Sequence, residues 1–253
     1  MDYIYILGIK LHKIKKKDIL KKIKEWLAGD KFHYITTVNP EFILEAQKDK
    51  EFKDILNNAD LSIPDGMGLK FAAWFFGRNI YRVPGADLTK ELLKIEGRKY
   101  FFIWKEGLSG VEDVKRAVNG RDALQCVSTA AKCEIDGQAI ERDGRDIDWK
   151  KFNDFSPDIL FVGLGAPYQE KLIAKIKAEI GQGSDDYSIC QTAEVLDGEC
   201  FVKQTNGGIL RPPGARAQND ALFRREIKVV IGIGGTFDFL TGKTCRAPKI
   251  IRM

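Results

Sequence analysis

Short runs of β-branched and aromatic residues alternate along the chain with stretches in which apolar residues recur at helical spacing. The runs occupy residues 3–9, 32–38, 99–104, 158–165 and 228–235, and a shorter one, 59–65, ends in Pro64 and Asp65. Strands that are apolar on both sides and separated by helices are typical of a parallel sheet. The pattern therefore predicts an α/β fold with a mainly parallel sheet flanked by helices.

The first helical stretch lies between the first two runs. Its apolar positions are Ile19, Leu20, Ile23, Trp26 and Leu27, and lysines fill most of the remaining positions. This spacing predicts a helix that covers the sheet and exposes a lysine-rich face. A helix that binds a membrane surface is the alternative interpretation. A second helical pattern follows over residues 42–56.

Two stretches, residues 105–150 and 181–226, fit the alternation of strands and helices poorly. Both are polar, and long structureless loops are uncommon in compact domains. We therefore expect one Rossmann-like domain over residues 1–253 that carries two irregular polar insertions, each either a small β-hairpin or disordered.

Composition limits the partners without identifying them. The 41 basic and 36 acidic residues leave a formal charge of +5, which allows an anionic ligand or surface but does not require one. The five cysteines form no CxxC pair, and the start of the chain has no secretory signal, so reduced thiols and a cytoplasmic location are expected. No apolar run approaches the roughly 20 residues that span a bilayer, so any contact with the inner face of the membrane is expected to be peripheral.

Candidate chemical groups lie where the predicted strands end. In an open parallel sheet, ligands bind beyond the carboxyl ends of the strands. Thr37, Asn39, Asp65, Gly165 and Gly234 all occupy such positions. We therefore predict that these five residues surround one crevice.

Two of these residues also have purely structural interpretations. Asn39 precedes Pro40, so its side chain can either bind a substrate or cap the helix that starts there. Asp65 stands in the segment IPDGMG (63–68), where Asp-Gly is also a common turn. If Asp65 lies within hydrogen-bond reach of a sugar hydroxyl, it can instead act as a general base.

Two glycine turns at strand ends suit a phosphate group. GLGAPYQEKLI (163–173) leads from a strand into a helix, whose free N–H groups form an anion site, and Gln169 in its first turn can bond a base or a sugar. The second turn, GIGG (232–235), contains Gly234 and Gly235. Neither turn matches the dinucleotide-binding or P-loop pattern, which argues against a nicotinamide enzyme or a P-loop ATPase.

No metal site or cofactor is predicted. Asp146 and Asp148 have the DxD form that many sugar transferases use to hold a divalent cation, but this pattern is expected by chance in a chain with 36 acidic residues. The spacing of the cysteines is unlike that of zinc ligands.

Five segments, taken in order, resemble the signature blocks of the WecG/TagA/CpsF glycosyltransferase family. They are ITTVNPEF (35–42), NADLSIPDGMG (58–68), RVPGADL (82–88), PDILFVGLGAPYQEKLI (157–173) and VVIGIGGTFDFLTGKTCRAPK (229–249). The resemblance implies a metal-independent, inverting transfer of an N-acetylmannosamine-type sugar from UDP to polyprenyl-diphosphate-linked N-acetylglucosamine. The product would serve teichoic acid or related surface-polymer synthesis.

The resemblance also implies roles for individual residues. Asp65 matches the family's proposed base, and Thr37 and Asn39 match its polar pair that contacts substrate. Arg82 matches an arginine near the donor diphosphate, although a surface arginine or a salt bridge to Asp87 is the alternative. Gln169 matches a glutamine associated with binding of the nucleotide-sugar.

The family pattern continues beyond RAPKIIRM (246–253) with a basic, aromatic appendage that contacts the membrane, and we expect this sequence to lack it. A catalytically silent protein that binds a nucleotide-sugar is therefore one alternative function. A basic nucleic-acid-binding module is another, motivated only by net charge and the lysine-rich helix. The sequence leaves the oligomeric state, including a homo-oligomer, open.

Overall fold

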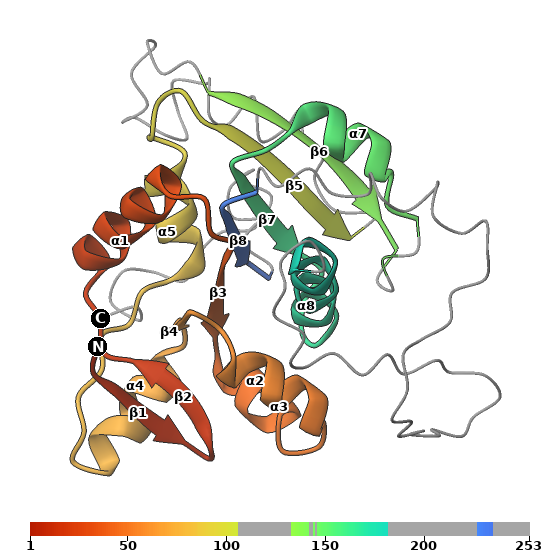
Figure 1. Cartoon of the computed structure of the whole chain (residues 1–253). Helices are drawn as coiled ribbons and strands as arrows, with labels where there is room; N and C mark the ends of the chain where they lie inside the picture. Colours follow the sequence, from red (N-terminus) through yellow and green to blue (C-terminus); the bar gives the residue numbers. More distant parts are fainter. Residues whose placement is uncertain (106–132, 142–143, 145, 182–226, 235–253) are drawn as a thin grey trace, which may run out of the picture.

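The computed structural model describes residues 1–105, 133–141, 144, 146–181 and 227–234 (Figure 1). Within them, six parallel strands form one sheet in the order β4-β3-β8-β7-β5-β6. The sheet has helices on both faces, which confirms the predicted α/β, Rossmann-like class.

Five of the predicted runs supply strands of this sheet. They are β3 (His33–Val38), β4 (Leu61–Pro64), β5 (Lys99–Lys105), β7 (Ile159–Gly163) and β8 (Val229–Gly232). All residues of β4, β7 and β8 are buried, as expected for strands that are covered on both faces. Two-sided apolar character was therefore a correct signal for these strands.

The first run is an exception, because it lies outside the main sheet. β1 (Tyr3–Ile6) pairs antiparallel with β2 (Ile9–His12) in a separate two-stranded sheet. The chain reverses at Leu7 and Gly8, which have φ of 47° and 78°. Left-handed conformations at both central residues are typical of tight hairpin turns. The prediction that residues 3–9 form a strand of the parallel sheet was wrong.

The two faces of the sheet are covered by different helices. α1 (Lys16–Ala28) and α5 (Gly85–Leu92) pack on one face, and α7 (Trp149–Phe155) and α8 (Tyr168–Gly181) pack on the other. α1 buries Ile19, Ile23 and Leu27 and exposes most of its lysines, as the helical spacing predicted. Side chains on either face of the sheet therefore pack against apolar residues of these helices.

A third apolar cluster joins the hairpin to the helices that flank β4. It contains residues of β2, α2 (Pro40–Glu45), α3 (Lys50–Asn57) and α4 (Met67–Phe75). The single helical pattern at residues 42–56 is divided into α2 and α3, because Asp49 caps a new helix by accepting a hydrogen bond from Phe52 N. Nowhere in the described ranges is a helix both long enough and apolar enough to cross a membrane.

The stretch 105–150, expected to be irregular, contributes an edge strand to the main sheet. β6 (Glu134–Ile140) pairs parallel with β5 rather than forming a hairpin. Its strand character is obscured in the sequence by Asp136 and Gly137, residue types that are depleted in strands. Residues 106–132, and residues 182–226 of the second predicted insertion, lie outside the described part of the chain.

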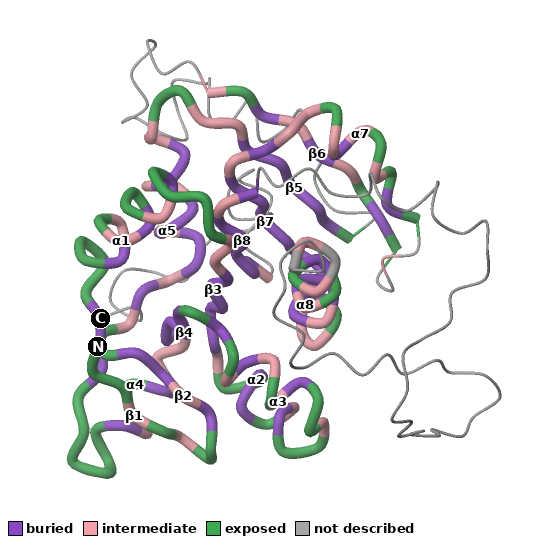
Figure 2. The backbone as a smooth tube through the Cα atoms, in the orientation of Figure 1, coloured by how far each residue is buried: buried purple, intermediate pink, exposed green. Residues whose placement is uncertain are grey.

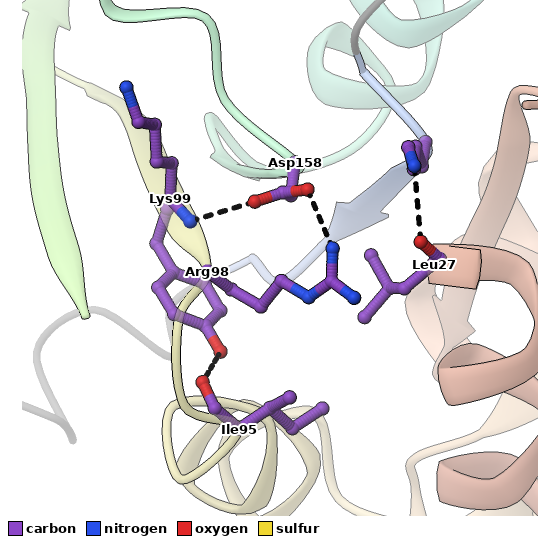
Figure 3. A network of polar contacts seen from close by, with 7 residues as sticks. Leu27, Ile95, Arg98, Lys99 and Asp158 are labelled. Carbon is purple, nitrogen blue, oxygen red and sulfur yellow. Dashed lines mark hydrogen bonds and ion pairs between the residues drawn. The ribbon is translucent and has the colours of Figure 1, made fainter. Parts of the chain in front are cut away.

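Polar contacts at the amino ends of three strands connect them to the helices (Figure 3). The Asp158 carboxylate accepts hydrogen bonds from Arg98 Nη1 and Lys99 N, both at 3.0 Å. Tyr100 donates its hydroxyl to carbonyl oxygens at the end of α5, and Lys228 Nζ donates to Leu27 O at 3.2 Å. These contacts stabilise the edge of the sheet opposite to the one where ligands are expected.

We predict that Asp158→Ala destabilises the protein by about 1 to 3 kcal/mol, because two donors lose an acceptor in a largely buried site. The measurement is the free energy of unfolding in urea. Glu25→Ala is the matched control, because Glu25 forms an exposed pair with Lys21 at 4.0 Å. Exposed pairs of this kind contribute little to stability. Equal losses in the two variants would contradict the role assigned to Asp158.

Candidate active site

The carboxyl ends of β4, β3, β8 and β7 lie side by side along one edge of the sheet. Asp65, Asn39, Gly234 and Gly165 follow these strands, and Thr37 is the penultimate residue of β3. The structure therefore brings together all five residues that were predicted to share a crevice. Gly235 lies outside the described residues.

Asp65 is held by the segment that precedes α5. Gly85 N donates to Asp65 Oδ2 at 3.0 Å, and Arg82 Nε donates to Asp65 O at 2.8 Å. Val83 N donates to the neighbouring carbonyl of Pro64 at 2.9 Å. Since Gly85 is the first residue of α5, the half-buried carboxylate sits at the positive end of that helix. RVPGADL thus fixes the position of the proposed base.

The glycines of IPDGMG are required by packing rather than by an unusual φ. Gly66 has φ of −89°, which any residue can adopt. A Cβ added to Gly66 would lie 2.5 Å from Pro40 Cδ, and one added to Gly68 would lie 3.0 Å from Pro40 Cγ. The loop after β4 therefore packs directly on the loop after β3. This contact keeps Asp65 close to Asn39.

Thr37 and Asn39 both make structural hydrogen bonds. Thr37 Oγ1 donates to Gly232 O at 2.7 Å and so joins β3 to the end of β8. Asn39 Oδ1 accepts from Phe42 N at 3.0 Å and caps α2, which is the structural interpretation of this residue. Thr37 is buried, whereas Asn39 is half-buried at the edge of the site.

The two glycine turns face open space. Gly165 and Gly234 have φ of 78° and 52°, and a Cβ added to either residue would meet nothing within 4 Å. Left-handed backbone favours glycine, and the absence of side chains lets a ligand approach the main chain closely. α8 begins three residues after Gly165, so the positive end of its helix dipole lies beside the first turn.

Gln169 is fully buried and holds one of these turns. Its Oε1 accepts from Gly234 N at 3.0 Å, and its Nε2 donates to Glu170 Oε1 at 2.6 Å. Its exposed fraction is 0%. A Cβ added to Gly232 would lie 2.7 Å from Gln169 Nε2. Gln169 therefore acts on the site indirectly, because its hydrogen bond fixes the position of the Gly234 turn.

Glu170, next to Gln169, was missed by the sequence interpretation. It too has an exposed fraction of 0%, and Thr36 Oγ1 donates to its Oε1 at 3.5 Å. Within the described ranges its Oε2 has no hydrogen-bond partner. Burial raises the pKa of this carboxyl from its ordinary value of 4.5 to about 8. Burial also raises the pKa of nearby Tyr34, so the cluster between β3 and α8 is uncharged at neutral pH.

The two carboxylates of the DxD form have structural partners. Glu141 N donates to both oxygens of Asp146, at 3.0 and 3.1 Å. Asp148 Oδ1 accepts from Lys151 N at 2.9 Å and caps α7. Both residues follow β6, at the opposite end of the sheet from β4. The strand order therefore separates them from Asp65.

We predict that Glu170→Gln makes stability less sensitive to a rise in pH from 4.5 to about 8. Because the folded-state pKa is raised, folded Glu170 keeps a proton that the unfolded chain releases above pH 4.5, and wild-type stability falls as pH rises towards 8. Glutamine keeps the acceptor for Gln169 and has no charge to bury. The measurement is the free energy of unfolding in urea between about pH 5 and about pH 9.

Glu41→Gln, at an exposed position, is the control, and it should leave the pH dependence unchanged. A steep loss of stability in the Glu170→Gln variant at every pH would show that the structure requires the ionised carboxylate.

We predict that Gly66→Ala separates the loops after β3 and β4, because the new methyl group would clash with Pro40. Overpacking of this kind costs about 1 to 3 kcal/mol. Gly29→Ala is the control, because a Cβ there would meet only Trp26 O at 3.6 Å. Thermal unfolding of both variants is the measurement, and equal stability would contradict the packing role of Gly66.

Three proteins similar to this chain share the name N-acetylglucosaminyldiphosphoundecaprenol N-acetyl-beta-D-mannosaminyltransferase. The protein from Bacillus subtilis strain 168 is 31% identical over 140 residues, which cover 55% of this chain and 53% of that protein. The protein from Bacillus spizizenii is 25% identical over 233 residues, which cover 88% of this chain and 68% of the relative. The protein from Staphylococcus aureus strain NCTC 8325 is 25% identical over 174 residues, which cover 66% and 65%.

The match thus spans about half the length of the Bacillus subtilis relative. The model of one protein family, described as "Glycosyl transferase WecG/TagA/CpsF family", matches residues 4–184. This range contains Thr37, Asn39, Asp65, Arg82 and Gln169, so the match includes most of the candidate site described above. The chain belongs to the WecG/TagA/CpsF glycosyltransferase family.

Proposed function

We propose that this chain is an inverting glycosyltransferase. In this proposal it moves N-acetylmannosamine, or a related sugar, from UDP to polyprenyl-diphosphate-linked N-acetylglucosamine in the synthesis of a teichoic acid-like surface polymer. The observation that carries the proposal is the fixed carboxylate of Asp65 in the crevice of a chain that belongs to this family. The names of the relatives support the choice of substrates.

Asp65 is the general base in this proposal. Its carboxylate would remove the proton of the acceptor hydroxyl as the oxygen attacks the anomeric carbon of the donor, and UDP would leave from the opposite side. A base held by hydrogen bonds needs no reorganisation before it acts. The bonds from Gly85 N and Arg82 Nε supply this support. Thr37 and Asn39 would line the substrate side of the same crevice.

The donor diphosphate would lie over the glycine turns at Gly165, Gly234 and Gly235. The positive end of α8 suits an anion, and the open space above Gly165 and Gly234 leaves room for it. The positive charge of Arg82, fixed beside Asp65, would offset charge that develops on the departing UDP. Gln169 would contribute by holding the Gly234 turn.

We further propose that the transfer needs no metal ion and no cofactor, and that it takes place on the cytoplasmic side of the membrane that carries the acceptor. In this scheme Arg82 and the positive end of α8 would supply the positive charge that a cation supplies in other sugar transferases. Contact with the membrane is peripheral.

Release of UDP from UDP-N-acetylmannosamine, with a lipid-linked N-acetylglucosamine acceptor, tests the proposal. Turnover in the presence of a chelator is expected, and loss of turnover that added Mg²⁺ restores would contradict the metal-independent route. Binding of UDP without any turnover would support a silent nucleotide-sugar-binding protein instead.

We predict that Asp65→Asn lowers turnover by roughly 100-fold or more, because proton transfer by a positioned base contributes about that much. Asparagine keeps an oxygen that can accept from Gly85 N, so thermal stability should stay close to that of the wild type. The measurement is the rate of UDP release at saturating substrate. Asp54→Asn, at an exposed position of α3, is the matched control. Equal rates in the Asp65→Asn variant and the wild type would remove Asp65 from the mechanism.

A further inference from the structure

α4, which follows Asp65 after one residue, exposes a row of large aromatic side chains. The exposed fractions are 62% for Phe71, 75% for Trp74 and 80% for Phe75, and Phe76 at the end of the helix is 71% exposed. Residues three and four apart share one face of a helix, so Phe71, Trp74 and Phe75 form a single stripe. The opposite face buries Leu69 and Ala73. Clustered exposed aromatic groups of this kind mark a binding surface.

The β1 strand extends this surface. Tyr3, Tyr5 and Leu7 are 53%, 60% and 61% exposed. Tyr3 and Tyr5 line a hollow of about 310 Å³ together with Phe76 and Arg78. Figure 2 shows β1 and α4 together at the edge of the molecule, away from the main sheet. We call Phe71, Trp74, Phe75, Phe76, Tyr3 and Tyr5 the aromatic face.

The charges along α4 are all positive. Residues 66–83 contain Lys70, Arg78 and Arg82 but no aspartate or glutamate, although the whole chain has 36 acidic residues. Lys70 and Arg78 are both exposed; Lys70 precedes Phe71 in α4, and Arg78 follows the end of the helix by three residues. Asp2 is the acidic residue that borders the neighbouring hollow beside β1. The face therefore combines aromatic groups with a local excess of positive charge.

We propose that the aromatic face binds the interfacial region of an anionic lipid bilayer. Tryptophan and tyrosine favour the headgroup level of membranes, and basic residues beside them are attracted to anionic lipids. A second copy of this chain fits the face less well. A twofold interface would bring the same patch against itself and oppose its positive charges.

This inference deepens the proposed function, because it names the surface through which a lipid-linked acceptor is reached. α4 starts two residues after Asp65, so a bilayer held against α4 would present lipid-linked sugars close to the base. Binding to vesicles is measured without donor or acceptor. Its outcome is therefore independent of whether the chain transfers a sugar.

The test is co-sedimentation of the full chain with vesicles of phosphatidylcholine alone and with vesicles that also contain phosphatidylglycerol. The wild type is expected to bind the anionic vesicles more tightly. Lys70→Gln combined with Arg78→Gln should weaken this binding roughly 30-fold, because each basic residue near an anionic surface contributes about fivefold. Trp74→Ser combined with Phe75→Ser should weaken binding to both vesicles roughly tenfold or more.

Two control variants carry matched changes elsewhere. Leu44→Ser replaces an apolar residue of α2 that is 61% exposed, and Lys21→Gln with Lys24→Gln removes two exposed charges from α1. Both should leave vesicle binding unchanged. Loss of binding in the α1 variant alone would assign the membrane to the lysine-rich helix and overturn the proposal.

Absence of vesicle binding by the wild type would also overturn it. So would a Trp74→Ser and Phe75→Ser variant that binds vesicles normally but has lost self-association in analytical ultracentrifugation. Circular dichroism of each variant confirms that it is folded, which is expected because the substituted side chains are exposed.

Discussion

Burial of the parallel sheet on both faces is the constraint on which the rest of the structure depends. Helices cover each face, and the polar contacts of Asp158 and Tyr100 close the amino ends of the strands. A ligand can therefore reach the strand residues only beyond their carboxyl ends. There the loops after β3, β4, β7 and β8 must satisfy their own backbone groups while leaving space for a substrate. The polar side chains at this edge consequently form hydrogen bonds that hold the loops in place.

Three side chains of the candidate site also make structural hydrogen bonds. Thr37 joins β3 to β8, Asn39 caps α2, and Asp65 receives the first N–H of α5. Each contact orders a loop at the edge where the proposed function places the substrates. Truncation to alanine would therefore disturb structure and chemistry together. Replacements that keep the hydrogen-bonding shape but change the charge separate the two effects.

The sequence predicted the parts of the fold that are apolar on both sides or strictly periodic. Five strands and α1 were of this kind. The β1–β2 hairpin was misplaced because its alternating tyrosines and isoleucines resemble a strand run until the reversal at Leu7 is known. β6 was missed because Asp136 and Gly137 interrupt it. Strand-end placement of Asp65 followed from the pattern, but its bonds to residues 82–85 depend on a loop path that no local signal specifies.

The cluster around Glu170 could have been recognised from helical spacing. Gln169, Ile173 and Ile176 repeat at intervals of four and three, and Glu170 lies three residues before Ile173, so both polar residues face the sheet with the apolar ones. A buried acid–amide pair at the start of α8 then holds the Gly234 turn.

On the other side of the crevice, the loop that carries Asp65 continues directly into α4, whose nine residues rise about 14 Å. The two walls thus differ in kind. One contains the buried Gln169–Glu170 pair and the Gly234 turn, and the other leads to the exposed aromatic residues of α4. Under the proposed function, the acceptor would meet Asp65 from the α4 side, and the donor would lie over the glycine turns. The two substrates would then approach from different sides, which is the arrangement that an inverting displacement of UDP requires.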